Sequence, residues 1–587
     1  MAPRDPSAAW TRRDAALASI AAIAALVAYL PALGVSFTSD DFFILDRVRA
    51  QGGLQHALAY FERGFFDYYR PLAFVAHALD WQLWGARAAG FHLTNIVLHA
   101  AASALVFAIG RRLLDRSAAL LAALLFALHP ASHEAVYWIA ARFDLLATTF
   151  MLASLLLLWR DEAWRYGLGV VCFALALLSK ESALSLPVIA AGADVLLARR
   201  EWRAVALRLI PLLIVIGVYA LLRAHGVEVS VTGGARRLPK LAMIVASLGG
   251  LVLLAKVRPN IVFRNQTIAA SLSAGVIVAG AAGALWLAPP LSAWMREKLG
   301  FLAFAGFNLA SPVVLPPPPP YFLDITTPVY AIAGLLTIGA LVAVAWRAAG
   351  WITSQPRVLF LIVFVVAALI PVSSLTGGGR YLYLASVGSS LVAGLVWESI
   401  SRRTLMTGAF AIVLAVSAAQ LVIAARAWGW ASTMTTDGLR LMTSDLAPCG
   451  SRDVVLLTAP VGIRGTYCNF LWEAFGQTSE CAPATFRTLL RVVRTDVHAD
   501  ISRPAPGLIE IRVPHYTGNI LASSDLSTFE VWIARGGSAD VATPLGRLQA
   551  AAAGDAEIFR LTLDPALRDA RLYAYSDGRI NAVPPAR

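Results

Sequence analysis

The sequence predicts a polytopic α-helical membrane protein that ends in a separate β-rich domain, and three observations indicate this. Of its 587 residues, 58% are hydrophobic and only 14% are charged, whereas soluble domains are about 45 to 50% apolar and about 25% charged. The runs 15–34 and 358–379 hold no charged residue and are long enough to cross a bilayer. After about residue 428, short alternating runs separated by Gly, Pro, Ser and Asp favour strands.

About thirteen transmembrane helices are expected from the apolar runs. They lie near residues 15–34, 92–110, 117–129, 143–159, 166–179, 183–198, 204–223, 240–256, 267–288, 328–346, 358–374, 382–399 and 405–425. This layout places the N-terminus inside and the C-terminal domain outside, provided that residues 289–327 stay outside. Whether residues 298–315 span the membrane or are re-entrant stays open, and a span there would invert the later loops.

The net charge of +13, from 49 basic and 36 acidic residues, has a membrane explanation. Residues 428–587 hold 15 Arg and 16 Asp or Glu, which gives −1, so residues 1–427 carry +14. Seven basic clusters can all face the cytoplasm, as the positive-inside rule requires, although Arg236, Arg237 and Lys240 then fall outside. The clusters are Arg4, Arg12 and Arg13; Arg111, Arg112 and Arg116; Arg160 and Arg165; Arg199, Arg200 and Arg203; Lys256, Arg258 and Arg264; Arg347 and Arg357; and Arg402 and Arg403. Nucleic acid is therefore not an expected partner.

Two domains are expected. Residues 1–427 form a transmembrane domain with a long first outer loop at 35–91, and residues 428–587 form an extracytoplasmic soluble domain of usual size. The second domain holds three of the four cysteines, Cys449, Cys468 and Cys481. One disulfide can form among them, and its pairing is undetermined.

Two adjacent carboxylates, Asp40 and Asp41, follow the first apolar run closely. Such groups near an apolar boundary repel each other and lose solvation, which suits one of them to general-base work. The alternative is structural, because Ser39-Asp40-Asp41 can open a surface helix as its cap.

The first outer loop is rich in aromatic rings, as in FERGFFDYYRPLAF, and is expected to lie along the membrane surface as amphipathic helices. Tyr68, Tyr69 and Arg70 are candidates for contact with a lipid-linked substrate. An interfacial aromatic belt with a snorkelling arginine is the alternative.

The second outer loop, LHPASHEAVYWIAARFD, is expected to form a helix. Glu134, Trp138 and Arg142 are four residues apart and would share one face of it. His129 and His133 are also four apart, but they have no clear third ligand, so no metal site is expected.

Charged residues also stand at the outer ends of other spans. Lys180 and Glu181 lie alone between two apolar runs, where they either pair with each other or serve a function. In TGGGRYLYLAS, Arg380 lies beside Tyr381. The planar fork of an arginine can hold two phosphate oxygens, and the preceding glycines allow close approach. An interfacial anchor is the alternative.

Five motifs resemble those of a known family in order and approximate spacing. They are YYRPLAFVAHALDWQLWG, AAGFHLTNIVLHA, LHPASHEAVYWIAARFDLLA, LLSKESALSLP and GRYLYLASVG. The family is that of the transmembrane and tetratricopeptide-repeat-containing O-mannosyltransferases and their bacterial relatives, of the GT-C class. The resemblance implies a GT-C fold in a bacterial inner membrane. It also implies transfer of a sugar, mannose in the best-known members, from a polyprenyl-phosphate donor on the outer face, without a cofactor.

The resemblance also implies which residues form the site. It places the family's acidic pair at Asp40 and Asp41, its His-Pro and Glu at His129, Pro130 and Glu134, its Arg and Asp at Arg142 and Asp144, its Lys-Glu at Lys180 and Glu181, and its Arg-Tyr at Arg380 and Tyr381. Two departures stand out. Gly379 occupies a position where an acidic residue often precedes the arginine, and the C-terminal domain lacks the repeats of the animal enzymes.

The implied chemistry is a single displacement with inversion at the sugar. Asp40, or else Asp41, would take the proton of an acceptor hydroxyl. Arg380, Lys180 and Arg142 would stabilise the phosphate as charge builds on it. The outer domain would position a protein or glycan acceptor.

Other functions stay open at this point. A lipid or solute transporter or flippase also needs many spans, but it predicts ionisable residues or broken helices near the bilayer midplane, whereas the charges here gather at the outer ends. An oligosaccharide ligase, or an aminosugar transferase that modifies lipid A or another cell-envelope glycan, shares the GT-C fold.

Cysteine labelling tests the membrane layout. If the seven basic clusters face the cytoplasm, cysteines introduced at Ser401 and Ser523 react from opposite sides of the membrane. Labelling of both positions from the outside would break the thirteen-span layout.

Overall fold

The computed structural model divides into two compact units, Met1–Leu33 with Gly52–Ala424 and Gly34–Gln51 with Ala425–Arg587. It describes residues 10–226 without 39, 63 and 65–67, parts of 301–309, and residues 355–372, 378–400, 403–445 and 453–584, the last with gaps at 461, 464–465, 468–485, 493–497, 515–519, 524–529, 534–537, 544, 554–555 and 578. Several expectations lie outside the described residues: the spans near 240–256, 267–288 and 328–346, most of 298–315, and Cys449, Cys468 and Cys481.

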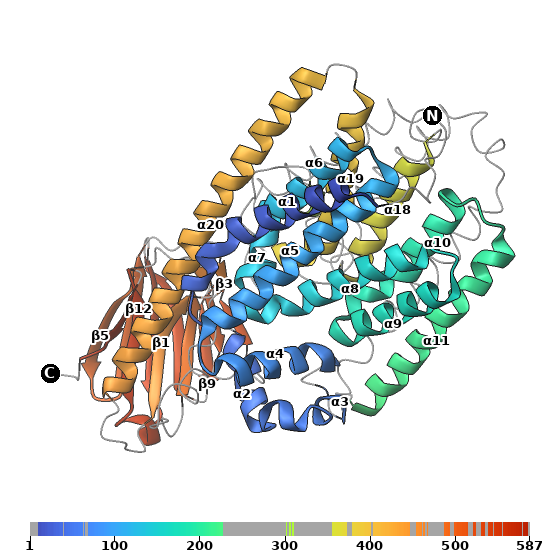
Figure 1. The fold of residues 1–587 in the computed structure, drawn as a ribbon. Helices are drawn as coiled ribbons and strands as arrows, with labels where there is room; N and C mark the ends of the chain where they lie inside the picture. The colour runs from blue at the N-terminus through green and yellow to red at the C-terminus, as the bar shows by residue number, and fades with distance from the viewer. Residues whose placement is uncertain are drawn as a thin grey trace, which may run out of the picture. The chain divides into compact units, whose positions relative to one another are not determined.

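The described part of the first unit is helical (Figure 1). Its α-helices are α1 (Arg12–Tyr29), α3 (Ala59–Glu62), α4 (Pro71–Trp84), α5 (Ala88–Leu113), α6 (Arg116–Leu128), α7 (His133–Tyr137), α8 (Arg142–Leu158), α9 (Ala163–Ser179), α10 (Leu186–Leu196), α11 (Trp202–Gly226), α18 (Pro356–Leu369), α19 (Tyr383–Ser399) and the first part of α20 (Arg403–Asp445). Short 3-10 helices join them: η1 (Leu30–Gly34), η2 (Gly53–His56), η3 (Pro130–Ser132), η4 (Ile139–Ala141), η5 (Glu181–Ser185), η7 (Ile370–Val372) and η8 (Gly379–Leu382).

Six helices within the described residues are long and apolar enough to cross a membrane. They are Arg12–Gly34, Ala88–Leu113, Ile139–Leu158, Trp202–Gly226, Gly379–Ser399 and Thr407–Ser444. The pair Arg116–Leu128 and Pro130–Tyr137, bent by 45°, would make a seventh, and Ala163–Ser179 and Pro356–Val372 are shorter apolar helices. A membrane protein with several apolar helices is therefore confirmed, while the expected number of thirteen is not.

Small residues allow the helices of the first unit to approach closely. A Cβ added at Gly110 of α5 would lie 3.1 Å from the Cβ of Ala119 on α6. One added at Gly394 of α19 would lie 2.7 Å from the carbonyl oxygen of Ala118, also on α6. Membrane helices pack through such small residues because backbones can then come into contact.

A buried hydrogen-bonded triad fixes the start of α19 to α5 and α6. His99 Nδ1 lies 2.7 Å from the Tyr383 hydroxyl, and His99 Nε2 lies 3.0 Å from the Ala127 carbonyl oxygen. Because a carbonyl only accepts, Nε2 carries the proton and the Tyr383 hydroxyl donates to Nδ1. The triad thereby holds η8, which immediately precedes Tyr383.

The second unit contains α2 (Asp41–Ala50), the end of α20, and strands in two main sheets. The strands are β1 (Val454–Pro460), β2 (Gly462–Ile463), β3 (Thr466–Tyr467), β4 (Phe486–Val492), β5 (Asp500–Ala505), β6 (Leu508–Pro514), β7 (Ile520–Ser523), β8 (Glu530–Ile533), β9 (Ala539–Thr543), β10 (Gly546–Ala553), β11 (Ala556–Leu563), β12 (Arg571–Ser576) and β13 (Arg579–Ala582). One sheet has the order β13-β12-β1-β4-β7-β8 and the other β5-β6-β11-β10-β9, with β2 and β3 as a separate pair. The expected C-terminal strands are confirmed.

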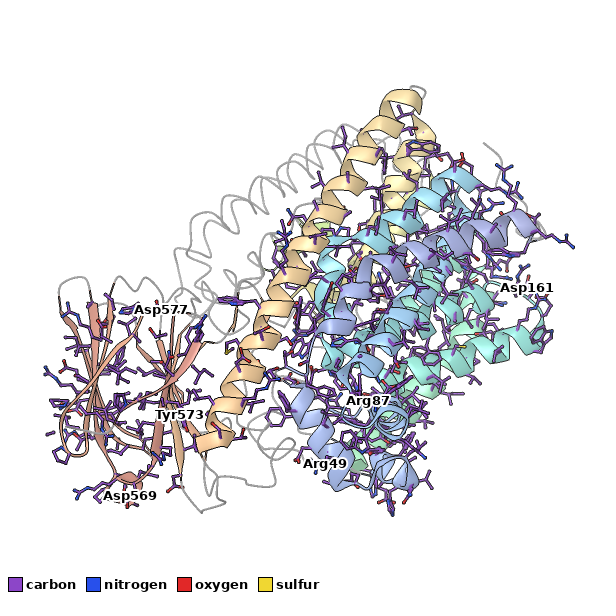
Figure 2. The ribbon with its side chains drawn as sticks, turned by 60° about the vertical axis from the view of Figure 1, so that its left-hand side comes forward. Arg49, Arg87, Asp161, Asp569, Tyr573 and Asp577 are labelled. Carbon is purple, nitrogen blue, oxygen red and sulfur yellow. The ribbon has the colours of Figure 1, made fainter. Side chains whose placement is uncertain are left out.

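Among the described residues of the second unit, one apolar core joins α2, α20 and strands of both main sheets. Four consecutive residues of β1, Val454 to Leu457, are buried, as in a strand covered on both faces. In β6 only alternate residues are buried, because one face of that sheet meets solvent. Asp569 and Asp577 lie at opposite ends of β12 (Figure 2).

Phe42 of α2 and Met434 of α20 belong to the same core as β1. Residues 34–51 were expected in the transmembrane domain, but they group with the C-terminal unit.

Candidate active site

Arg380 lies in η8, where residues from two distant loops meet. Its guanidinium pairs with Glu134 Oε1, and its backbone N–H donates to Glu134 Oε2 at 3.3 Å. Arg380 Nη2 also donates to the Tyr381 hydroxyl at 2.8 Å, and the guanidinium lies 4.4 Å from the ring centre of Trp138. Both Glu134 and Trp138 therefore orient this arginine.

Glycine at position 379 has a steric cause. A Cβ added there would lie 2.7 Å from the carbonyl oxygen of Ala131 and 3.4 Å from Glu134 Oε2. Backbone cannot move aside as a flexible side chain can, so no larger residue fits, and an acidic one would also meet the Glu134 carboxylate. In this chain Glu134 supplies the carboxylate beside Arg380.

The expected single helix across the second outer loop was wrong. The chain leaves the helical conformation at Trp138, with φ −87° and ψ 115°, and α8 starts afresh at Arg142. Arg142 therefore does not share a face with Glu134 and Trp138. A break of this kind between two apolar runs leaves no mark in the i, i+4 spacing.

Arg142 is fully buried and engaged within the fold. It donates to Asn95 Oδ1 at 2.8 Å and to the Phe91 carbonyl oxygen at 2.8 Å, and it pairs with Asp80 Oδ2 at 2.6 Å. Another N–H lies 3.3 Å from the Ala76 carbonyl oxygen. The expected contact of Arg142 with phosphate does not fit this arrangement, which makes the residue a structural tie between α4, α5 and α8.

Lys180 forms a buried ion pair with Asp144 instead of pairing with Glu181. Its Nζ lies 2.6 Å from both carboxylate oxygens of Asp144 and 5.0 Å from the ring centre of Tyr381. Burial lowers the pKa of Lys180, Asp144 opposes this effect, and the nearby Arg70 and Arg380 add to it, so that the pKa is about 8. An anion that binds beside Lys180 would raise this pKa, because a nearby negative charge favours the protonated form of a lysine.

Glu181 binds two arginines. Arg70 Nε and Nη2 donate to Oε2 at 3.0 and 2.8 Å, and Arg223 Nη1 donates to Oε1 at 2.9 Å. Burial would raise the pKa of Glu181, but the two arginines lower it to about 2. Glu181 therefore stays ionised and acts as an anchor for Arg70, which also lies 4.2 Å from the ring centre of Tyr68.

Sequence reasoning missed Arg223. It falls at the end of an expected span, and it lies in the last turn of α11. An arginine at the outer end of a span, on the side that the positive-inside rule leaves poor in basic residues, was the available signal.

Two other candidates have structural roles in the first unit. The Tyr69 hydroxyl donates to the Phe61 carbonyl oxygen at 2.9 Å, and its ring is buried, so it does not face a lipid-linked substrate. His129 Nδ1 accepts the backbone N–H of Ala131 at 3.2 Å and caps η3. Among the described residues, no group of three or more His, Cys, Asp or Glu could hold a metal ion.

These contacts define an interloop cluster of residues that are distant in sequence. It consists of Arg70, Glu134, Asp144, Lys180, Glu181, Arg223, Arg380 and Tyr381. Its members occupy helix ends or the turns beside them, as expected for charges at the edge of a membrane. With four cations and three carboxylates, the cluster has a net charge of +1.

The acidic pair lies in the second unit. Asp41 begins α2, is 1% exposed, and accepts the backbone N–H of Thr38 at 2.9 Å. Asp40 is half-buried at the N-cap position and makes no capping bond with its side chain. Asp40 therefore makes no side-chain cap of α2, and the Asp41 carboxylate holds the backbone just before the helix, at Thr38.

A family model matches the region that holds most of the interloop cluster. The family model described as "Dolichyl-phosphate-mannose-protein mannosyltransferase" matches residues 71–225. Protein O-mannosyl-transferase F38B6.6 of Caenorhabditis elegans is 32% identical over 206 residues, which cover 33% of this chain and 30% of the relative. Protein O-mannosyl-transferase Tmtc2 of Drosophila melanogaster is 34% identical over 194 residues, which cover 29% and 21%. The chain thus spans less than a third of the length of these relatives.

A solved structure, ArnT from Cupriavidus metallidurans bound to undecaprenyl phosphate, aligns with 75% of this chain and 73% of its own. The sequence identity is 16% and the TM-score is 0.36, which is too low to establish a shared fold. The family model and these relatives confirm the resemblance that the motifs predicted. The family model places the similarity to mannosyltransferases at residues 71–225.

Proposed function

We propose that this chain is a GT-C glycosyltransferase that transfers a sugar, mannose in keeping with the names of its relatives, from a polyprenyl-phosphate donor to an acceptor hydroxyl. The interloop cluster is the observation that carries the proposal, since its excess of one positive charge complements the single negative charge of a phosphodiester. The enzyme would lie in a bacterial inner membrane, with the cluster and the C-terminal unit on the extracytoplasmic side.

The proposed reaction is one displacement. The acceptor oxygen attacks the anomeric carbon, the bond from that carbon to the phosphate oxygen breaks, and Asp40 takes the acceptor's proton. The leaving phosphodiester becomes a phosphate monoester and gains negative charge. Arg380 and Lys180 stabilise that charge, because preorganised cations in a site of low dielectric act most strongly where charge develops. The sugar inverts, and the roles of these residues need no cofactor.

A transporter or flippase is the second candidate, and the placement of the charges argues against it. Lys180 follows α9, Arg223 ends α11, and Arg380 precedes α19. A transporter would instead place its ionisable groups where helices break near the midplane. A GT-C enzyme that modifies lipid A or another cell-envelope glycan would use the same cluster, and its product would distinguish it.

The proposal predicts a loss of product on Asp40→Asn. Mass spectrometry of glycoproteins, cell-envelope glycans and lipid A from cells with the parent chain should show a sugar that is absent from cells with the variant. With purified protein, transfer from polyprenyl-phosphate mannose should fall by roughly 100-fold or more, because the base is removed with almost no change in volume.

Asp46→Asn is the matched control, since Asp46 is an exposed carboxylate on the same helix. It should transfer at the parent rate. An Asp40→Asn variant that is fully active would remove Asp40 from the chemistry. A sugar found only on lipid A would assign the chain to the alternative enzyme class.

Arg380→Lys should impair donor use by roughly tenfold or more, and Arg380→Ala should impair it further. In the parent, Nη1 pairs with Glu134 and Nη2 donates to the Tyr381 hydroxyl. The three donors of lysine share one nitrogen, which cannot occupy both positions and also reach a phosphate oxygen, whereas a guanidinium spreads five donors over three nitrogens. Initial rates at several donor concentrations measure the effect. Arg87→Lys, at an exposed arginine before α5, is the control, and parent-like rates for Arg380→Lys would contradict the phosphate role.

The kcat/KM for the donor should fall as pH rises through about 8, because Lys180 then loses its proton. Unfolding does not explain such a fall. The pKa of Lys180 is lower in the folded protein than in the unfolded chain, where it is 10.5. Between these two values the unfolded chain binds more protons, so the free energy of unfolding rises with pH. Lys180→Arg stays charged and should lose this pH dependence. A level profile of the parent across this range would contradict the assignment.

A further inference from the structure

The segment that carries the acidic pair is tied to the C-terminal unit at several points. The backbone N–H of Ser36 donates to the Ser432 hydroxyl at 2.8 Å, and Ser432, on α20, is almost fully buried. Two residues later, the Thr38 N–H donates to the Asp41 carboxylate. These bonds fix the chain on the N-terminal side of α2.

Phe42 fixes the same segment from the other side. It is 3% exposed and belongs to one apolar core with Met434 and Met442 of α20 and with the buried residues of β1. Its ring centre lies 6.4 Å from that of Phe37, which packs against this core as well. Asp40 and Asp41 therefore lie between two aromatic anchors in a stretch of six residues.

We propose that the C-terminal unit is the scaffold that positions the acidic pair, with Phe42 and Ser432 as positioning residues. The inference rests on the proposed function, in which Asp40 accepts the proton of the acceptor. A base is effective only when it is held within hydrogen-bond reach of that proton, and a displacement of about 1 Å can lower the rate roughly 100-fold. The unit thus sets the turnover rate through Asp40, while donor binding depends on the interloop cluster.

Steady-state kinetics of the full chain in detergent, with polyprenyl-phosphate mannose as donor, test this inference. Phe42→Ala should lower kcat roughly 10- to 100-fold and leave the KM for the donor unchanged. Ser432→Ala removes one hydrogen bond and almost no volume, so it should fold and lower kcat in the same direction. Phe42→Leu and Ser432→Thr should recover much of the lost rate, because they keep the apolar anchor and the hydroxyl acceptor.

Ile511→Ala is the control for general destabilisation. Ile511 lies on β6, in the other sheet, and is part of the same core. This variant should lower the melting temperature but not kcat at a temperature where the protein is folded. If Ser432→Ala and Phe42→Ala both keep the parent kcat while Asp40→Asn is inactive, the scaffold role of the C-terminal unit is wrong. The role of Asp40 as the base would then still stand. Full activity of Asp40→Asn would overturn both.

Discussion

A charged side chain that is buried among helix ends needs a partner of opposite sign, because packed protein does not replace the water that the charge loses. This constraint organises the first unit. Lys180 has Asp144, Arg380 has Glu134, and Glu181 is shared by two arginines. Each pair joins residues from different loops, so satisfying the charges also fixes the ends of α8, α9, α11 and α19.

The same pairing prepares the cluster for the proposed chemistry. The cations are already desolvated and oriented before a phosphate arrives, so little reorganisation accompanies the reaction. Their carboxylate partners bring the net charge of the cluster close to zero. The Tyr381 ring lies next to both cations, 5.0 Å from Lys180 Nζ and 4.5 Å from the Arg380 guanidinium.

The sequence predicted what depends on composition and local pattern. Uncharged runs gave helices, alternating runs gave the C-terminal strands, and charges at span ends gave Glu134, Lys180, Glu181 and Arg380. It did not predict what depends on contacts over long separations. The bond from Ser36 to Ser432 joins residues 396 positions apart. The burial of Arg142 depends on α4 and α5. The periodicity of the sequence predicts neither this burial nor the bond from Ser36 to Ser432.

The bond from Ser36 to Ser432 has a consequence for biosynthesis. Chains grow at about 5 to 20 residues per second, so the partner of Ser36 is made about 20 to 80 s after Ser36 itself. During that interval the apolar side chains of Phe37 and Phe42 lack the core they later occupy. The nascent protein must keep this segment from aggregating. A chain whose synthesis stops before α20 would have every residue of the interloop cluster but no support for the helix that carries the acidic pair.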